Sequence, residues 1–297
     1  MVNKDEILQD RDKNILFEIY ENLYKKLSNN HTDIFLCGKN LSEPSPNIRG
    51  DIYENLKNDE NLMIFFPEKV FSEYFNINKD ADYLELENLL AENVDFVCIA
   101  CESEGAFVEL GAFANSPNLK EKLIILNDKN FKDEPSFINM GPIKHLKKFN
   151  KNSVIYYDDE ADINKICKNL KSKFKANLKE NDPPKAIDKI TGMFYFISIL
   201  LYFLGKLNKN KLRIFVKYVV DNLEKTNESF DFLATYNATE KSLFNFKFVK
   251  NINNNNSLGI TDLGKKFVFD LIHKKTKSIY NKVISDIIKY KYYHYSS

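Results

Sequence analysis

The segment from Glu102 to Ala114 combines residue types that a nucleotide-processing site needs. It reads ESEGAFVELGAFA and directly follows the apolar run Val94–Cys101. Gly105 permits a tight turn and close approach of a ligand to the backbone. The helix that begins behind it offers amide donors and a positive partial charge, which suit a phosphate or a sugar hydroxyl. We therefore place the candidate site in this loop and at the start of this helix.

Glu109 is the candidate nucleophile of the segment. We expect it in about the first turn of the helix, with Val108 and Leu110 packing beside it. The small residues that follow, Gly111 and Ala112 among them, should let the helix lie close to a sheet. A carboxylate held there can attack the anomeric carbon of a ribosyl ring and form a covalent glycosyl–enzyme intermediate, as in retaining glycosidases. The alternative is a glutamate that caps or solvates an ordinary helix, and the surrounding loop favours the chemical role.

The first half of the chain alternates apolar strands with helices. The expected strands are Thr32–Cys37, Leu62–Phe66, Val94–Ala100, Lys122–Leu126 and Ser153–Tyr157, and the expected helices include Tyr83–Ala91, Phe107–Ala114 and Ala161–Leu178. Strands that are apolar throughout and separated by helices are typical of a parallel sheet covered on both faces. We therefore predict an α/β, Rossmann-like catalytic domain over residues 1–180. Ligands of such sheets bind beyond the carboxyl ends of the strands, which here are the loops after Cys37, Phe66 and Cys101.

The second half, residues 181–297, is predicted to be a separate, mostly α domain that begins after the breaker Asp182-Pro183-Pro184. We expect helices over Ala186–Leu204 and Lys211–Leu223, two short ones over Glu228–Tyr236 and Thr239–Phe244, a hairpin of Phe246–Val249 and Leu258–Ile260, and a further helix after Thr261. Short helices followed by a hairpin with a polar tip are typical of a winged helix that binds DNA. The Asn-rich tip could instead be a low-complexity loop. A helical tail is expected at the C-terminus.

Charge is distributed unevenly between these halves. The 297 residues have a formal net charge of +1, but residues 1–182 contain 24 basic against 33 acidic residues, and residues 183–297 contain 19 against 9. A basic half is a candidate for contact with nucleic acid. Because only three of the basic residues of the whole chain are Arg, the contact should be made by Lys to phosphates rather than by bidentate reading of bases.

The four cysteines are expected to be reduced. Cys98 and Cys101 have the CxxC spacing, but both lie in an apolar run, with no second pair and no His nearby. We expect ordinary strand thiols and no metal site. The start of the chain, Met1–Asp12, is charged, and the longest apolar stretch, Met193–Leu204, is shorter than a bilayer span. We therefore expect a cytoplasmic protein without a membrane segment.

Several motifs resemble those of one protein family. They are residues 84–95 (LELENLLAENVD), 103–113 (SEGAFVELGAF) and 136–143 (SFINMGPI), together with 35–38 (FLCG), 66–68 (FPE) and 261–264 (TDLG). The Glu-Leu-Gly context is similar to that of the nucleoside 2-deoxyribosyltransferase superfamily. The full set resembles the ribosyltransferase-like effectors of bacterial retrons, which join this domain to a C-terminal winged-helix DNA-binding domain. The resemblance extends over most of residues 31–275.

The resemblance implies roles for individual residues. Glu109 matches the nucleophile of the superfamily. Ser103 stands where simple deoxyribosyltransferases have an Asp that assists at the base, and this departure favours hydrolysis or a different acceptor over base exchange. Glu87 or Glu102 could supply the missing acid. The residues expected to bind substrate are Phe35, Cys37, Gly38, Asp82, Asn88, Glu102 and Gly105, and Lys39 and Arg49 are candidates for phosphate, each with a plain surface role as the alternative.

The resemblance also implies a function. We expect an antiphage retron effector, a toxin that cleaves the N-glycosidic bond of a nucleotide, with NAD as the leading substrate and no cofactor. A reverse transcriptase and its multicopy single-stranded DNA are the expected partners, and an oligomer is expected. Two alternatives are a nucleotide sensor with a DNA-binding domain but no turnover, and a nucleoside deoxyribosyltransferase of salvage.

Overall fold

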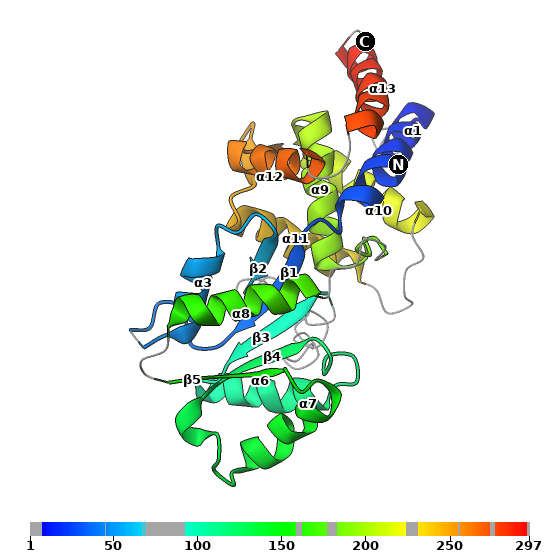
Figure 1. Cartoon of the computed structure of the whole chain (residues 1–297). Helices are drawn as coiled ribbons and strands as arrows, with labels where there is room; N and C mark the ends of the chain where they lie inside the picture. The colour runs from blue at the N-terminus through cyan, green and yellow to red at the C-terminus, as the bar shows by residue number, and fades with distance from the viewer. Residues whose placement is uncertain are drawn as a thin grey trace. The chain divides into compact units, whose positions relative to one another are not determined.

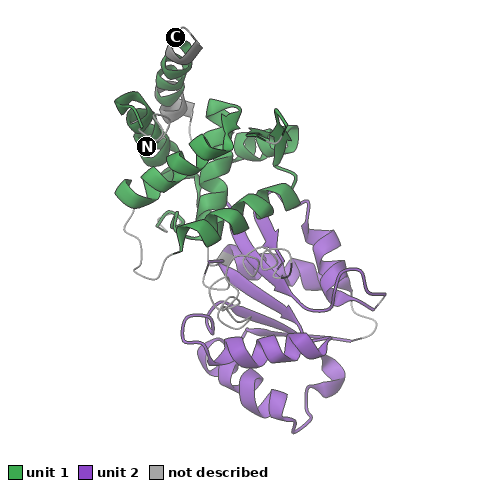
Figure 2. Cartoon of the chain, turned by 180° about the vertical axis from the view of Figure 1, so that it is seen from behind, with its two compact units in different colours: residues 1–30, 72–78, 182–297 green, residues 31–71, 79–181 purple. Residues whose placement is uncertain are grey.

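The computed structural model describes residues 8–44, 46–66, 68, 93–158, 162–176, 183–223, 231–254, 256–273 and 277–295. The chain divides into two compact units, shown in different colours in Figure 2. The sheet unit comprises residues 31–71 and 79–181, and the helical unit comprises residues 1–30, 72–78 and 182–297. The predicted division grouped the N-terminal residues with the sheet. In the structure they pack with the C-terminal half instead.

The sheet unit is built on five parallel strands in the order β2-β1-β3-β4-β5 (Figure 1). They are β1 (Thr32–Cys37), β2 (Leu62–Phe65), β3 (Phe96–Ala100), β4 (Leu123–Asp128) and β5 (Val154–Tyr157). β1 pairs with β2 and β3, so that Ile34 lies opposite both Ile64 and Phe96. This is the flavodoxin-like order of doubly wound sheets, in which the direction of strand succession reverses between β1 and β3. The predicted parallel α/β sheet is confirmed.

Helices cover both faces of this sheet (Figure 1). They are α3 (Ile48–Leu56), α6 (Glu104–Asn115), α7 (Lys144–Phe149) and α8 (Ile163–Ala176), with the short turns η3 (Lys129–Phe131) and η4 (Asn139–Ile143). One apolar cluster joins α3 and α8 to alternate strand residues, among them Leu36 and Cys98. Successive strand side chains point to opposite faces, so Phe35 and Cys37 belong to the face that α6 covers. All five predicted strands are present, with ends that differ from the prediction by at most two residues.

The helical unit combines helices from both ends of the chain. They are α1 (Asp10–Ile19), η2 (Tyr20–Tyr24), α2 (Lys25–Leu27), α9 (Ile190–Leu204), α10 (Lys209–Leu223), α11 (Phe232–Asn245), α12 (Asp262–His273) and α13 (Lys277–Tyr295). A small antiparallel sheet, in the order β6-β8-β7, contains β6 (Leu207–Asn208), β7 (Val249–Ile252) and β8 (Ser257–Ile260). β7 and β8 form the predicted hairpin. Its first strand begins three residues later than predicted, and its second strand begins one residue earlier.

α9 explains why the N-terminal helices belong to this unit. Nearly all of its residues are buried, with Tyr202 as the exception, and a helix that is apolar all round must be covered on every side. Tyr20 and Tyr24 of η2 each meet the ring of Phe196 edge to face, with ring centroids 6.3 and 5.6 Å away. The Tyr24 hydroxyl also donates a hydrogen bond to the Lys185 carbonyl. The apolar face of residues 8–30 therefore completes the core around α9.

The prediction of two short helices in this region was wrong, because the structure has the single helix α11. The described residues 232–245 form one continuous helix, capped by Asp231, whose side chain accepts from Ala234 N at 3.1 Å. Thr239, expected to begin a second helix, is fully buried and donates its hydroxyl to the Ile190 carbonyl at 3.4 Å. Packing against α9 thus carries the helix through the polar positions that suggested a break.

The described part of the chain contains no helix that is both long enough and apolar enough to cross a bilayer. It also contains no cluster of three or more His, Cys, Asp or Glu residues placed to hold a metal ion.

Candidate functional site

The candidate site lies at the carboxyl ends of β1 and β3, on either side of the switch point. β1 ends at Cys37 and is followed by Gly38, and β3 ends at Ala100 and is followed by the loop 101–103 that leads into α6. The predicted loops after the first and third of these strands are therefore neighbours, because β1 and β3 are paired along their length. This is where doubly wound sheets bind their ligands.

Ser103 defines the start of α6. It is the N-cap, with extended backbone, and its hydroxyl accepts a hydrogen bond from Ala106 N at 3.3 Å. The helix therefore begins at Glu104, three residues earlier than predicted, and Glu109 lies in the second turn rather than the first. Gly105 is inside the helix, and a side chain there would meet open space, so the tight turn expected of it is not present. Its predicted role in binding substrate rests on backbone access alone.

The packing of α6 also differs from the expectation. Ala106, Leu110 and Phe113 are its fully buried residues, whereas Val108 is 65% exposed. A side chain at Gly111 would again meet open space, so this glycine is not what brings the helix to the sheet. Glu109 lies between the buried and exposed faces, at the side of the helix.

The carboxylate of Glu109 is close to the thiol of Cys101. Burial raises the pKa of Cys101 to about 12, and the negative charges of Glu109 and then Glu102 contribute in the same direction. Cys98 lies on the opposite face of the sheet, in the cluster with Cys167. The two thiols of the CxxC spacing therefore face different sides, and Cys101 belongs to the surroundings of the candidate nucleophile.

Glu102 has a contact that the sequence did not suggest. Its two carboxylate oxygens accept hydrogen bonds from the backbone of α3, from Ile48 N at 2.7 Å and from Arg49 N at 3.0 Å. A carboxylate at a helix N-terminus satisfies free amides and interacts favourably with the helix dipole. Glu102 thus fixes the start of α3 against the loop after β3. Its predicted role as an acid or substrate contact stays a prediction.

Arg49 was predicted either to bind phosphate or to be a plain surface residue. The structure supports neither role. It is 2% exposed, and its guanidinium donates to the carbonyls of Leu36, Gly38 and Lys39 at 3.0 to 3.3 Å. Its remaining nitrogen makes a bidentate pair with Glu68, at 2.8 and 2.9 Å. All of this side chain is used to hold the loop after β1.

Gly38 is the turning point of that loop. Its φ is +147°, and a Cβ added there would come within 3.1 Å of the Cβ atoms of both Ala100 and Arg49. β1 can therefore approach the end of β3 this closely only with glycine at this position. Phe35 and Cys37, which were predicted with Gly38 to bind substrate, are 1% and 0% exposed. They therefore support the loop from within the core.

Some predicted residues cannot be placed. Asp82, Glu87 and Asn88 lie outside the described residues. Lys39 is described, and its ammonium donates to the carbonyls of Pro44 and Pro46 at 3.1 and 3.4 Å, within its own loop. Among the described residues, the site therefore brings together Glu109, Cys101 and Ser103 with the loop held by Glu102 and Arg49.

Sequence reasoning missed the pair of Arg49 and Glu68. One signal was available: in a chain whose basic residues are nearly all Lys, a retained Arg points to a position that needs planar, bidentate geometry. Asp95 has a structural contact instead. Its carboxylate accepts from Asp33 N at 2.7 Å, at the entry of β1 and so at the far end of the sheet from the site.

A parallel sheet with a carboxylate-bearing helix at its switch point, and a separate helical unit, define a two-unit protein with an α/β half of the doubly wound class. The chain belongs to a retron effector family, described as STM3845 retron effector protein, whose family model matches residues 45–251. The resemblance to retron effectors drawn from the sequence motifs is thus confirmed.

Two relatives come from Escherichia coli. The "Retron Ec86 putative ribosyltransferase/DNA-binding protein" is 35% identical over 191 residues, which cover 60% of this chain and 62% of that protein. The protein of the same description from retron Ec73 is 39% identical over 117 residues, covering 38% of this chain and 37% of that protein. The chain thus matches less than two thirds of the length of either relative.

Proposed function

We propose that the sheet unit cleaves the N-glycosidic bond of a nucleotide, with Glu109 as the nucleophile and NAD as the leading substrate. The observation that carries this proposal is the position of Glu109, beside the end of β3 at the switch point of the sheet. The relatives' description as ribosyltransferases supports chemistry at a ribosyl carbon.

The proposed reaction has two steps. A carboxylate oxygen of Glu109 attacks C1′ of the ribose, the bond from C1′ to the base nitrogen breaks, and its electron pair leaves with the base. Water then attacks C1′, releases the sugar from Glu109 and loses its proton to the solvent or to a neighbouring base.

The surroundings of Glu109 favour a base that needs no proton to leave. Ser103 and Glu102, two described polar residues that precede Glu109, are engaged as the cap of α6 and the cap of α3. Nicotinamide is attached to the ribose of NAD as a cation, so that the departing electron pair neutralises it. This argues for NAD over a neutral nucleoside, whose base must be protonated.

A matched pair of variants tests the proposal. Glu109→Gln removes the nucleophile, and Glu104→Gln makes the same change on the exposed first turn of the same helix. We expect wild type and Glu104→Gln, freed of partners, to release nicotinamide from NAD, and Glu109→Gln to be at least about 1000-fold slower. Release of free nicotinamide, followed by chromatography, is the measurement.

The outcomes separate the competing functions. Equal turnover by Glu109→Gln and wild type would contradict the assignment of Glu109 as the nucleophile. Binding of NAD without turnover by wild type would favour a nucleotide sensor, and exchange of bases between free deoxynucleosides would favour a salvage enzyme.

For the helical unit we propose a winged helix that binds nucleic acid. Its elements follow in the order α9, β6, α10, α11, β7, β8, with β8 between β6 and β7 in the sheet. Three helices with a three-stranded sheet that ends in a hairpin are the parts of this motif. The relatives' description as DNA-binding proteins supports the same assignment.

We further propose that a reverse transcriptase and its multicopy single-stranded DNA bind the chain and restrain its activity, within an oligomeric complex. The family assignment supports a retron context. The test is co-expression: the partners should co-purify with the chain, and growth inhibition by wild type should disappear when both are present. Glu109→Gln should co-purify equally but inhibit growth in neither case.

A further inference from the structure

α11 stands where a winged helix carries its recognition helix, but its surface is poorly suited to DNA. The residues on its outer side are Leu233, Asn237, Glu240, Lys241 and Phe244, none of which is fully buried. Glu240 pairs with Lys209 at 3.2 Å. The polar residues on the other side are buried, as Thr239 and Ser242 show. A helix with one acidic and one basic residue on its outer side has no net attraction for phosphate.

Several lysines of the helical unit are neutralised by ion pairs. Those of α1, α10, α12 and α13 that pair with Asp among the described residues are Lys13, Lys211, Lys217, Lys265, Lys266 and Lys289. Three exposed lysines of the small sheet differ, because the described residues provide no ion pair for Lys206, Lys247 or Lys250. They therefore form a candidate cationic surface, which we call the sheet lysines.

The small sheet places two of these lysines in one row. Lys250 is paired with Gly259 across β7 and β8, and Lys206 precedes β6, whose Leu207 pairs with Leu258. A Cβ added to Gly259 would lie 3.9 Å from Lys206 Cβ and 2.4 Å from Ile252 Cδ1. Gly259 thus makes room for Ile252 between the two lysines. Because adjacent strands are about 4.8 Å apart, the two lysine backbones are about 10 Å apart.

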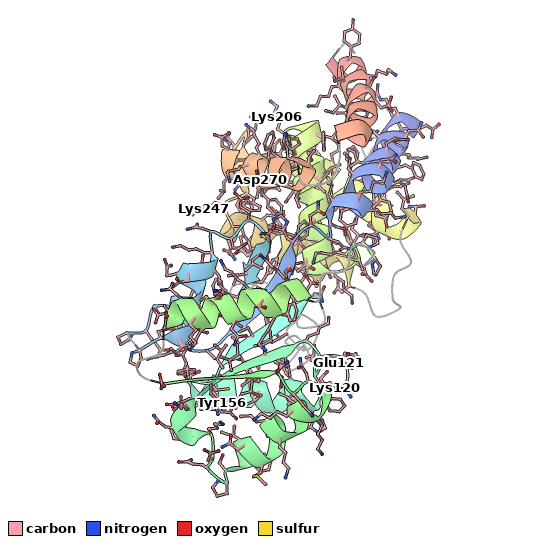
Figure 3. The ribbon with its side chains drawn as sticks, viewed as in Figure 1. Lys120, Glu121, Tyr156, Lys206, Lys247 and Asp270 are labelled. Atoms are coloured by element: carbon pink, nitrogen blue, oxygen red, sulfur yellow. The ribbon has the colours of Figure 1, made fainter. Side chains whose placement is uncertain are left out.

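Lys247 lies just before the hairpin, three residues ahead of Lys250. It has a φ of +58°, and its carbonyl accepts from the hydroxyl of Thr261, which also caps α12 through Gly264 N. In Figure 3, Lys206 and Lys247 lie on the same side of the helical unit, with Asp270 of α12 labelled between them. The exposed carboxylate of Asp262 interacts mainly with another lysine, because its pKa is lowered first by Lys265 and only lastly by Lys250.

We propose that the sheet lysines, and not α11, are the contact surface for nucleic acid, and that they bind the phosphate backbone of duplex DNA. This rests on the proposed nucleic-acid function of the helical unit. The 10 Å spacing corresponds to about three base pairs along the axis, within reach of long lysine side chains. Phe246 and Phe248, the aromatic residues beside the hairpin, pack inward on Phe194, so neither ring is placed for unpaired bases to stack on it.

The salt dependence of binding tests this surface. The variant Lys206→Gln/Lys247→Gln/Lys250→Gln should bind a 20-base-pair duplex about 100- to 500-fold more weakly than wild type in 0.1 M salt. The slope of log K against log salt should fall by about 2.7, because each lost phosphate contact removes about 0.9. Fluorescence anisotropy with the full-length chain measures both quantities, and far-UV circular dichroism verifies the fold.

Two control variants make the result specific. Lys13→Gln/Lys217→Gln/Lys289→Gln removes the same charge from ion-paired helix positions, and its slope should fall by less than 1. Asn237→Ala/Lys241→Gln alters the outer side of α11 and should leave affinity within about threefold of wild type. A larger loss from the α11 variant than from the sheet-lysine variant would overturn the proposal.

The remaining outcomes separate this inference from the function on which it rests. If wild type binds duplex DNA and the sheet-lysine variant keeps its slope, the inference alone fails. Binding of single-stranded DNA but no duplex would also overturn it and leave the nucleic-acid function in place. If wild type binds neither form, the proposed function of the helical unit fails as well.

Discussion

At the residue scale, Arg49 and Glu102 show how a site can be prepared by side chains that need not touch the substrate. Arg49 crosses from α3 to the carbonyls after β1, and Glu102 crosses from the loop after β3 to the amides of α3. The ends of β1 and β3 are therefore tied to the same helix start. We regard both as positioning residues for the loop at the switch point.

Replacing Arg49 by Lys should destabilise the sheet unit despite the conserved charge. An ammonium cannot reach three carbonyls and both oxygens of Glu68, so buried acceptors lose their partners, at a cost of about 2–3 kcal/mol. Urea unfolding measures the loss. Arg213→Lys, at an exposed position of α10, is the matched control and should change stability by less than about 0.5 kcal/mol. Equal stability of the two variants would contradict the bracing role.

These residue roles were the least predictable part of the site. The Glu109 segment could be selected from sequence because a polar, glycine-containing loop follows a buried strand. The burial of Arg49 could not, because its acceptors are backbone carbonyls that only the fold brings together. Likewise, Ser103 is a good N-cap residue, but Gly105 two residues later obscured the start of α6.

At the scale of elements, the strands were predictable because each is a short apolar run bounded by polar residues. The ends of the helices were harder to predict. α11 continues through Asn237 and Thr239 because it is buried against α9, and not because of local helix propensity. The hairpin was foreseen, although its first strand begins at Val249, where it was expected to end.

The thiols of Cys98 in β3 and of Cys101 in the loop just after it provide a further prediction. Burial raises the pKa of Cys98 and Cys101, the latter to about 12 from an unfolded value near 9. The folded state then holds protons that the unfolded state loses above pH 9, so stability should fall as pH rises from 9 toward 12. Each thiol contributes up to about 1.4 kcal/mol per pH unit.

Urea unfolding between pH 8 and pH 11 measures this slope. Cys101→Ala should be less stable at pH 8 and yet have a shallower decline, by about 1.4 kcal/mol per pH unit. A slope unchanged by that substitution would show that the thiol of Cys101 is not held neutral by the fold.

At the scale of the whole molecule, the helical unit is made from two distant parts of the chain. Asp12 of α1 accepts a hydrogen bond from Tyr290 of α13 at 2.5 Å and lies 3.5 Å from the ammonium of Lys211. No helix was predicted within the first thirty positions, and nothing in that part of the sequence identifies α9 as its packing partner. The predicted boundary therefore grouped these residues with the sheet.

Residues 183–297 expressed alone should fail to fold, since they lack the helices that cover α9. Residues 8–30 joined to 183–297 by a flexible linker should fold cooperatively, because the Asn29 side chain donates to the Pro183 carbonyl and Ser28 Oγ accepts from Lys185 N at 3.2 Å. Thermal unfolding followed by circular dichroism distinguishes the two chains. A cooperative transition in 183–297 alone would show that the N-terminal helices are dispensable.

The same contacts between residues 28–29 and 183–185 carry a consequence for biosynthesis. Residues 28–29 and 183–185 flank the sheet unit in the sequence, so the sheet can form on the ribosome before α9, on which η2 packs, has been synthesised. At about 5–20 residues per second, α9 follows residue 30 by about ten to thirty seconds. During that interval the apolar face of Leu16, Ile19 and Tyr20 has no core to join, which makes it a natural recognition site for a chaperone that binds nascent chains.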